Sequence, residues 1–169
     1  KSTYLITRAN FVACHNPAYI RKFNMVQEIV DGGTFLLNCP WSVEDLDQHL
    51  PGQVKKYIAD HKINFYIIDG VKIGIETGMG PTRINTILLT GIIPEAKAIE
   101  LMKEAAQKTY GRKGEDVVKK NWAAIDAGAT GVVKVDVPAE WSNCADEGLD
   151  YPKATEGLDK TLAFVNNIQ

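Results

Sequence analysis

Cysteine is scarce in this chain, and its three copies are spaced too widely to form a known ligand motif. Cys14, Cys39 and Cys144 have neither the CxxC nor the Cys/His spacing of a zinc or iron–sulfur site. Three cysteines are also too few for a disulfide framework. We therefore expect no metal site in this chain and a reducing, cytoplasmic location.

Long apolar runs and an excess of charge of either sign are missing too. Charges and prolines interrupt every apolar stretch before it reaches the roughly 20 residues that a membrane helix needs. The 19 basic and 21 acidic side chains nearly balance, to a net charge of -2, so no overall field attracts nucleic acid or an anionic membrane. We expect neither among the partners. The chain opens without Met or a signal peptide, which suggests a fragment or a processed chain.

Three short apolar segments have the composition of buried strands. They cover residues 9–14, 34–39 and 65–69, and their apolar residues are continuous instead of alternating. Such strands are covered on both faces, as in a parallel sheet between helices. Apolar residues at helical spacing fill the intervals, which gives a βαβαβ order with parallel strands. The predicted fold class is α/β, a three-layer, mostly parallel Rossmann-like sheet with flanking helices.

Capping residues and glycines predict where the helices of the first half begin and end. Asn16 and Pro17 suit the start of a helix that carries Tyr19 to Val30 and ends at Gly32-Gly33. Ser42 and Asp45 have the spacing of a capping box. We therefore expect one helix between the first two strands, and a short helix followed, after a break at Pro51-Gly52, by a further helix before the third strand.

The second half is predicted to contain a short helix over 71–77, an apolar segment over 84–89, two longer helices and an edge strand. Pro94 begins one helix, and the next carries Trp122 on a core-facing stripe and ends at Gly128. The edge strand is expected over residues 132–137, and Trp141, which follows a proline-containing turn, is expected to dock against another domain. From Ala139 onward acidic side chains outnumber basic ones, so we divide the chain into an α/β domain, residues 1–138, and an acidic extended linker or tail, residues 139–169.

Four longer strings are specific enough to indicate a family. They are FVACHNPAYI at 11–20, GGTFLLNCPWS at 32–42, KTYG at 108–111 and VPAEW at 137–141. Together and in this order they resemble the gamma-type domain of pyruvate:ferredoxin (flavodoxin) oxidoreductases. The resemblance reaches about Trp141. It also implies that the N-terminal part of the family domain, a glycine-rich strand-turn-helix unit, is lacking here, and that the segment 86–91 replaces a longer helix.

The resemblance implies an enzyme with thiamine diphosphate, Mg²⁺ and iron–sulfur clusters. That enzyme converts pyruvate and coenzyme A to acetyl-CoA and carbon dioxide and reduces ferredoxin or flavodoxin. Because other domains hold the cofactors in the family, this chain is expected to hold none and to be inactive alone. Its partners would be the other domains of the same enzyme and, through them, ferredoxin or flavodoxin. What remains for this domain is assembly and a part in coenzyme A binding.

The candidate site is the edge where the predicted strands end, since open α/β sheets bind ligands there. We assign no catalytic residue. Candidates for contact with coenzyme A or substrate are His15, Asn16, Asn38, Arg83 and Asn85. Arginine can hold a phosphate and asparagine can offer its amide. Local capping and turn formation explain His15 and the asparagines equally well.

Two alternatives stay open at this point. Cys14 and Cys39 follow neighbouring strands, so they suit either a redox site or plain packing as small buried hydrophobes. The whole chain suits either a part of the oxidoreductase or a stand-alone α/β module that binds a nucleotide-like ligand.

Overall fold

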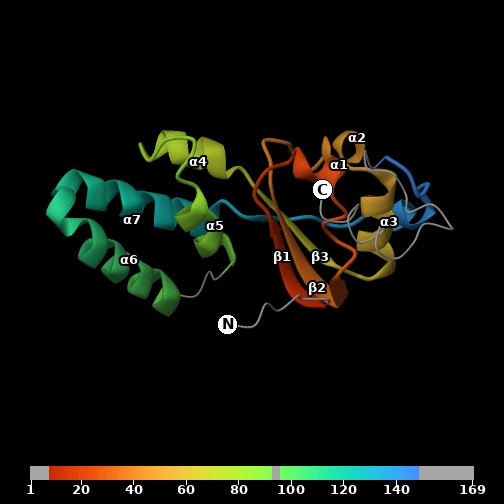
Figure 1. Ribbon diagram of the computed structural model, residues 1–169, viewed down its shortest axis with the longest axis horizontal. Helices are drawn as coiled ribbons and strands as arrows, with labels where there is room; N and C mark the ends of the chain where they lie inside the picture. Colours follow the sequence, from red (N-terminus) through yellow and green to blue (C-terminus); the bar gives the residue numbers. More distant parts are fainter. Residues whose placement is uncertain (1–7, 93–95, 149–169) are drawn as a thin grey trace, which may run out of the picture.

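The computed structural model describes residues 8–92 and 96–148, and they build a four-stranded sheet with helices on both faces (Figure 1). The spatial order is β1-β2-β3-β4. The first three strands are parallel and β4 is antiparallel to β3. The strands are β1 (Ala9–Cys14), β2 (Ile29–Asn38), β3 (Asn64–Ile68) and β4 (Val133–Lys134). The predicted α/β class with a mostly parallel sheet is confirmed.

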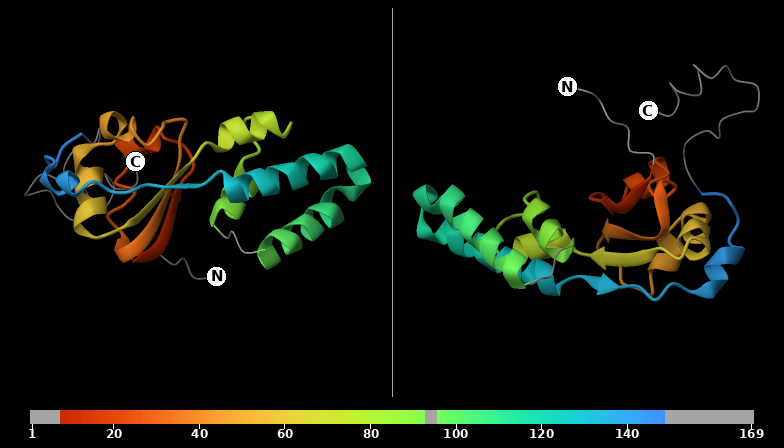
Figure 2. Two further views of the ribbon diagram at one scale, coloured as in Figure 1. Left: turned by 180° about the vertical axis from the view of Figure 1, so that it is seen from behind. Right: turned by 90° about the horizontal axis from the view of Figure 1, so that it is seen from below.

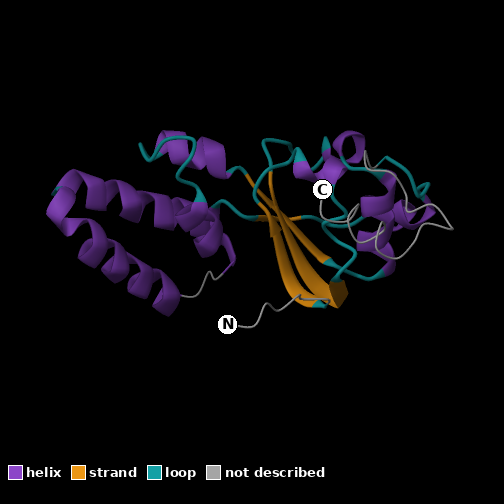
Figure 3. Cartoon of the chain, viewed as in Figure 1, coloured by secondary structure: helices purple, strands orange, loops and turns teal. Residues whose placement is uncertain are grey.

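The helices lie in two groups, one on each side of the sheet (Figure 3). On one side are α1 (Tyr19–Lys22), α2 (Leu46–His49), α3 (Gly52–Asp60) and the 3-10 helix η2 (Ala139–Asn143). On the other are α4 (Gly70–Glu76), α5 (Asn85–Ile92), α6 (Ala96–Tyr110), the 3-10 helix η1 (Gly111–Lys113) and α7 (Glu115–Thr130). Within the described ranges, no helix combines the length and hydropathy that crossing a membrane requires.

Two hydrophobic cores, one on each face, explain why the strands are apolar throughout. Phe35 and Phe65 stack with ring centroids 5.6 Å apart on the face covered by α3. Leu36 and Ile68 point to the opposite face, where they join Ile87 of α5. Because both faces of these strands are buried, polar residues do not alternate with apolar ones along them, as the sequence indicated.

The predicted first helix is wrong over most of its length. Helix α1 ends at Lys22, and the residues expected to continue it begin β2 at Ile29. The Tyr57 hydroxyl donates to the backbone carbonyls of Gln27 and Ile29, with both oxygens 2.9 Å away, and so fixes this segment against α3. Gly32, at φ +71°, lies inside the strand where its register with β1 shifts, and does not end a helix. Tertiary contacts here outweigh helical spacing.

Two tryptophans also differ from expectation. Trp141, which follows a proline turn and was expected to dock on another domain, is 4% exposed in the core beside Phe65. Its indole Nε1 donates to Asp47 Oδ1 at 3.1 Å. Trp122, expected in the core, is 37% exposed. Both predictions were wrong because the local sequence does not show which other part of the chain will pack over a given side chain.

The second half confirms its helices but not all of their boundaries. Helix α7 continues past Gly128 to Thr130, and Gly128 does not end the helix but packs closely against Ile87 and Thr90 of α5. The predicted edge strand 132–137 is shortened to β4, although Val135 N still donates to the Phe65 carbonyl at 2.9 Å. Pro94 and residues 149–169 lie outside the described residues, and the boundary at 138/139 stays a prediction.

Candidate functional site

A cleft of about 550 Å³ lies at the carboxyl ends of the parallel strands, between the end of β2 and helix α4. Its position matches the edge that the strand order predicted as the ligand side. The lining residues are Pro17, Asn38, Cys39, Pro40, Asp69, Val71, Lys72, Ile75 and Glu76. Most of the wall is apolar, and the charged groups come from the end of β3 and from α4.

Asn38 connects the three segments that form this end of the sheet. Its Nδ2 donates to the His15 carbonyl at 2.8 Å, and its Oδ1 accepts from the Gly70 backbone N–H, also at 2.8 Å. The residue is 3% exposed. One N–H and one lone pair of the amide are already used by the backbone, and the residue is almost fully buried, so Asn38 mainly shapes the cleft and offers little to a ligand.

Helix α4 supplies the charged rim of the cleft. The Asp69 carboxylate caps the helix by accepting from the Lys72 backbone N–H at 2.9 Å. This cap turns the chain so that Val71, Lys72 and Ile75 border the cleft, where Val71 is 39% and Ile75 59% exposed. Lys72 is exposed, and no ion pair of its ammonium group occurs within the described residues. The Lys72 ammonium group at the rim is thus available to pair with an anionic group of a ligand.

His15 and Asn16 lie beside the cleft but do not line it. Asn16 Oδ1 accepts from the Ala18 backbone N–H at 3.0 Å, a turn-forming bond. His15 is exposed and contributes its carbonyl to Asn38. The local interpretation therefore accounts for the contacts that both residues make. Their neighbour Pro17 is the residue of this turn that borders the cleft.

Arg83 and Asn85 are exposed residues at the start of α5, outside the lining of the cleft. Ile84 between them packs close to Gly70, where an added Cβ would lie 3.6 Å from the Ile84 Cβ. They therefore share the end of the sheet with Asn38, across α4 from the cleft. Of the five candidate residues, the structure places only Asn38 in the wall. Lys72 was missed because one lysine in the first turn of a helix has no sequence signature.

The two cysteines at the strand ends are buried thiols. Cys14 is 1% and Cys39 3% exposed, and burial raises the pKa of each thiol to about 11. The Cys14 thiol donates to the Asn16 carbonyl at 3.1 Å. Metal ligation and nucleophilic attack both need the thiolate, which this environment disfavours. The geometry favours packing over redox chemistry.

The described residues do not fit the metal ion and iron–sulfur clusters that the resemblance implies. Among residues 8–92 and 96–148, no three His, Cys, Asp or Glu side chains lie close enough together to hold a metal ion. An iron–sulfur cluster needs a set of cysteine thiolates, and the three cysteines here are free, two of them buried. We derive no chemical step through such a group in this chain.

Comparisons with known proteins support one family. The sequence profile described as "Pyruvate ferredoxin/flavodoxin oxidoreductase" matches residues 1–131. The chain is 39% identical over its whole length to pyruvate:ferredoxin oxidoreductase of Moorella thermoacetica, and 38% identical to pyruvate-flavodoxin oxidoreductase of Enterobacter agglomerans, but it spans only 15% of either relative. It is 42% identical to pyruvate dehydrogenase [NADP(+)] of Cryptosporidium parvum over 88% of this chain and 8% of that one.

A solved structure shows the same fold. The pyruvate oxidoreductase subunit PORC of Thermotoga maritima superposes with a TM-score of 0.60 at 13% identity, over 76% of this chain and 66% of that chain. The sheet with its flanking helices is thus shared where the sequences have diverged widely. Because the family profile covers most of its length, the chain belongs to the pyruvate ferredoxin/flavodoxin oxidoreductase family.

Proposed function

We propose that this chain is the gamma-type domain of an enzyme that oxidises pyruvate with coenzyme A and passes the electrons to ferredoxin or flavodoxin. The observation that carries the proposal is the match to such oxidoreductases along the whole chain. The domain itself would hold no redox cofactor. Its role would be to assemble with the other domains and to help bind coenzyme A at the strand-end cleft.

The chemistry of the cleft suits one part of coenzyme A in particular. The pantetheine arm is long and largely apolar with two amides, and apolar walls at Val71 and Ile75 can cover such a chain. Carboxylates of Asp69 and Glu76 can accept from the amide N–H groups. The Lys72 ammonium can pair with a phosphate oxygen, and Arg83 stays a second candidate for that role.

The test is Lys72→Ala in the complete oxidoreductase. A charge-assisted hydrogen bond to phosphate contributes about 1.5–3 kcal/mol, so the KM for coenzyme A should rise about 10- to 150-fold. The KM for pyruvate and the rate of decarboxylation should stay nearly unchanged, because neither step uses that ligand. Lys119→Ala is the matched control, an exposed lysine of α7 whose ion pair among the described residues is with Glu115 at 3.7 Å.

An unchanged requirement for coenzyme A in a stable Lys72→Ala variant would remove the cleft from the binding site, and the same result for Arg83→Ala would remove Arg83 as a phosphate contact. A rise in both KM values together would indicate a structural role instead. Either result leaves membership of the family intact, since that rests on the sequence match.

The second candidate function is a stand-alone module that binds a nucleotide-like ligand. It is favoured by one observation, that the cleft lies at the carboxyl ends of the parallel strands, where open α/β sheets bind nucleotide-like ligands. Isothermal titration of the isolated 169-residue chain with coenzyme A and with ADP separates the two hypotheses. Tight binding without any partner would support the module, whereas weak or absent binding would support a site completed by other domains.

A further inference from the structure

The hairpin of α6 and α7, residues 96–130, projects away from the sheet as an arm (Figures 1 and 2). The base of α7 packs on α5, while the substantial contacts of α6 are with α7 and η1. Of the 15 residues of α6, only Ala106 is buried. Helices in proteins owe most of their stability to tertiary packing of one face. A helix that buries one residue is therefore short of packing partners within the described part of the chain.

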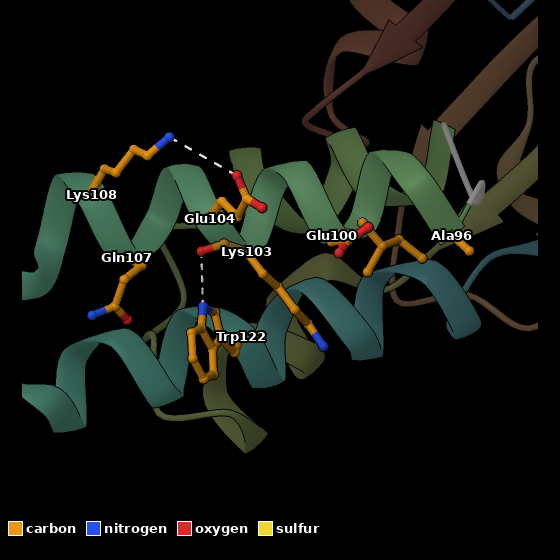
Figure 4. A pocket seen from close by; sticks show the side chains of 8 residues that line it. Ala96, Glu100, Lys103, Glu104, Gln107, Lys108 and Trp122 are labelled. Atoms are coloured by element: carbon orange, nitrogen blue, oxygen red, sulfur yellow. Dashed lines mark hydrogen bonds and ion pairs between the residues drawn. The ribbon is translucent and has the colours of Figure 1, made fainter.

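A groove of about 640 Å³ runs along this arm, larger than the strand-end cleft. Its centre is Trp122, which rises from α7 toward α6 and donates from Nε1 to the Lys103 carbonyl at 3.0 Å (Figure 4). The indole is thus held in one orientation while 37% of the residue faces solvent. The other lining residues are Ala96, Ile99, Glu100, Lys103, Glu104, Gln107 and Lys108.

The charges along the groove are unevenly compensated. Lys103 is paired with Asp126 across the hairpin at 2.6 Å, and Glu104 has a long contact of 4.0 Å with Lys108. Glu100 has no ion pair among the described residues. The groove therefore combines the exposed ring of Trp122 with the uncompensated carboxylate of Glu100. This combination is complementary to a segment that carries an apolar side chain next to a basic one.

We propose that this groove is the docking site for another polypeptide segment of the oxidoreductase, which presents an apolar side chain to Trp122 and a basic side chain to Glu100. Curated relatives carry several times more chain than is present here, since this chain spans 15% of two of them. That additional protein must meet this domain somewhere. Fixed, half-exposed tryptophans in grooves are the typical anchors of such contacts. The inference rests on the proposed assembly with other domains of the oxidoreductase and is independent of the proposed coenzyme A site.

Hydroxyl-radical footprinting with mass spectrometry tests the proposal. The oxidation rate of Trp122 is compared between the isolated 169-residue chain and the complete oxidoreductase. Burial of a central interface side chain should lower the rate by about an order of magnitude in the complete enzyme. Equal oxidation in the two samples would overturn the proposal.

Charge reversal distinguishes docking from an accidental covering. Glu100→Lys in the complete enzyme should restore Trp122 oxidation toward the rate of the isolated chain. Glu115→Lys, at the start of α7 and outside the groove, should leave Trp122 protected. If Glu100→Lys leaves the protection intact, the proposed basic partner is wrong.

Two checks keep the outcomes separate. Circular dichroism of the isolated chain with Glu100→Lys shows whether the arm still folds, and a lost helical signal would assign restored oxidation to misfolding and count against docking. Sedimentation of the isolated chain tests the other occupant, a second copy. A dimer that protects Trp122 without any other protein would overturn the assignment to another segment of the enzyme.

Discussion

Asn38 is the residue on which the end of the sheet depends. It is an amide among apolar neighbours, and each of its two polar groups pairs with a different segment of backbone. A shorter or apolar side chain would leave the Gly70 N–H and the His15 carbonyl without this partner. A polar residue near the end of a buried strand is therefore explained here by geometry as well as it would be by ligand binding.

Asn38→Ala should lower the free energy of unfolding by about 1–3 kcal/mol, because the Gly70 N–H is left buried without a partner, whereas the bond to the carbonyl of the exposed His15 is only partly buried. Urea denaturation of the isolated chain measures the change. Asn85→Ala, which replaces an exposed asparagine at the start of α5, should change stability by less than about 0.5 kcal/mol. Equal effects of the two substitutions would contradict the bridging role of Asn38.

The cysteines provide a second prediction at this scale. Burial raises the pKa of the Cys14 and Cys39 thiols from 9.0 to about 11, so at pH 8 their thiolate fractions are about 100-fold below that of an unshifted thiol. We expect Cys144, which is only partly buried, to react with iodoacetamide first, and Cys14 and Cys39 to react slowly. Peptide mapping of samples taken at increasing reaction times measures the labelling rate of each cysteine. Rapid labelling of either buried thiol would indicate a functional cysteine.

Among the elements, those with buried strand composition were predictable and the first helix was not. Strands β1 and β3 were placed within one residue from their continuous apolar sequences. Val26 and Val30 have helical spacing, yet Val26 lies in a bend and Val30 in β2, because bonds from Tyr57 and the pairing of Ile29 with β1 act on this segment. Those partners lie about 20 to 30 residues away, beyond the range of any local pattern.

Gly128 shows the same dependence on a distant neighbour. A Cβ at this position would collide with the Thr90 hydroxyl and lie 2.6 Å from the Ile87 carbonyl, both on α5. Gly128→Ala should therefore destabilise the chain by about 1–3 kcal/mol through overpacking, although alanine is the better helix former by about 1 kcal/mol. Thermal denaturation gives the measurement.

Gly111→Ala is the matched control for Gly128→Ala. The nearest atom to an added Cβ there is Gln107 Nε2 at 3.6 Å, an ordinary contact. This change should be neutral or slightly stabilising. A stable Gly128→Ala variant would mean that α5 and α7 can separate without cost, which would contradict the close packing described above.

For the whole molecule, the resemblance identified the family while the strand-end geometry located the cleft. The edge was predictable because parallel strands end together. Its charged rim was not, since Lys72 and Glu76 reach the cleft through the cap that Asp69 places on α4. Arg83 and Asn85 are close to the cleft in sequence, but α4 separates them from it. Which polar side chains line a cleft depends on how the neighbouring helices are oriented, and the sequence alone did not indicate the orientation of α4.

At this scale we predict that the isolated chain does not oxidise pyruvate. Electron transfer would need cysteine thiolates that bind iron–sulfur clusters, whereas Cys14 is a buried thiol with a raised pKa. Relatives named for the activity are also several times longer than this chain. Purified chain with pyruvate, coenzyme A, thiamine diphosphate, Mg²⁺ and oxidised ferredoxin should give no reduction above background. The Moorella thermoacetica enzyme serves as the positive control. Turnover by the isolated chain would overturn the assignment of a non-catalytic domain.

The segment from β4 to η2 has a consequence for synthesis of the protein. It runs from the arm along β3 and places Trp141 in the core, with a bond to Asp47 that spans 94 positions of sequence. Contacts between such distant positions require a long loop to close, which slows folding. On the ribosome, the core around Phe65 therefore stays open until Trp141 has emerged. A nascent chain that stalls before this point exposes that core to solvent and to chaperones.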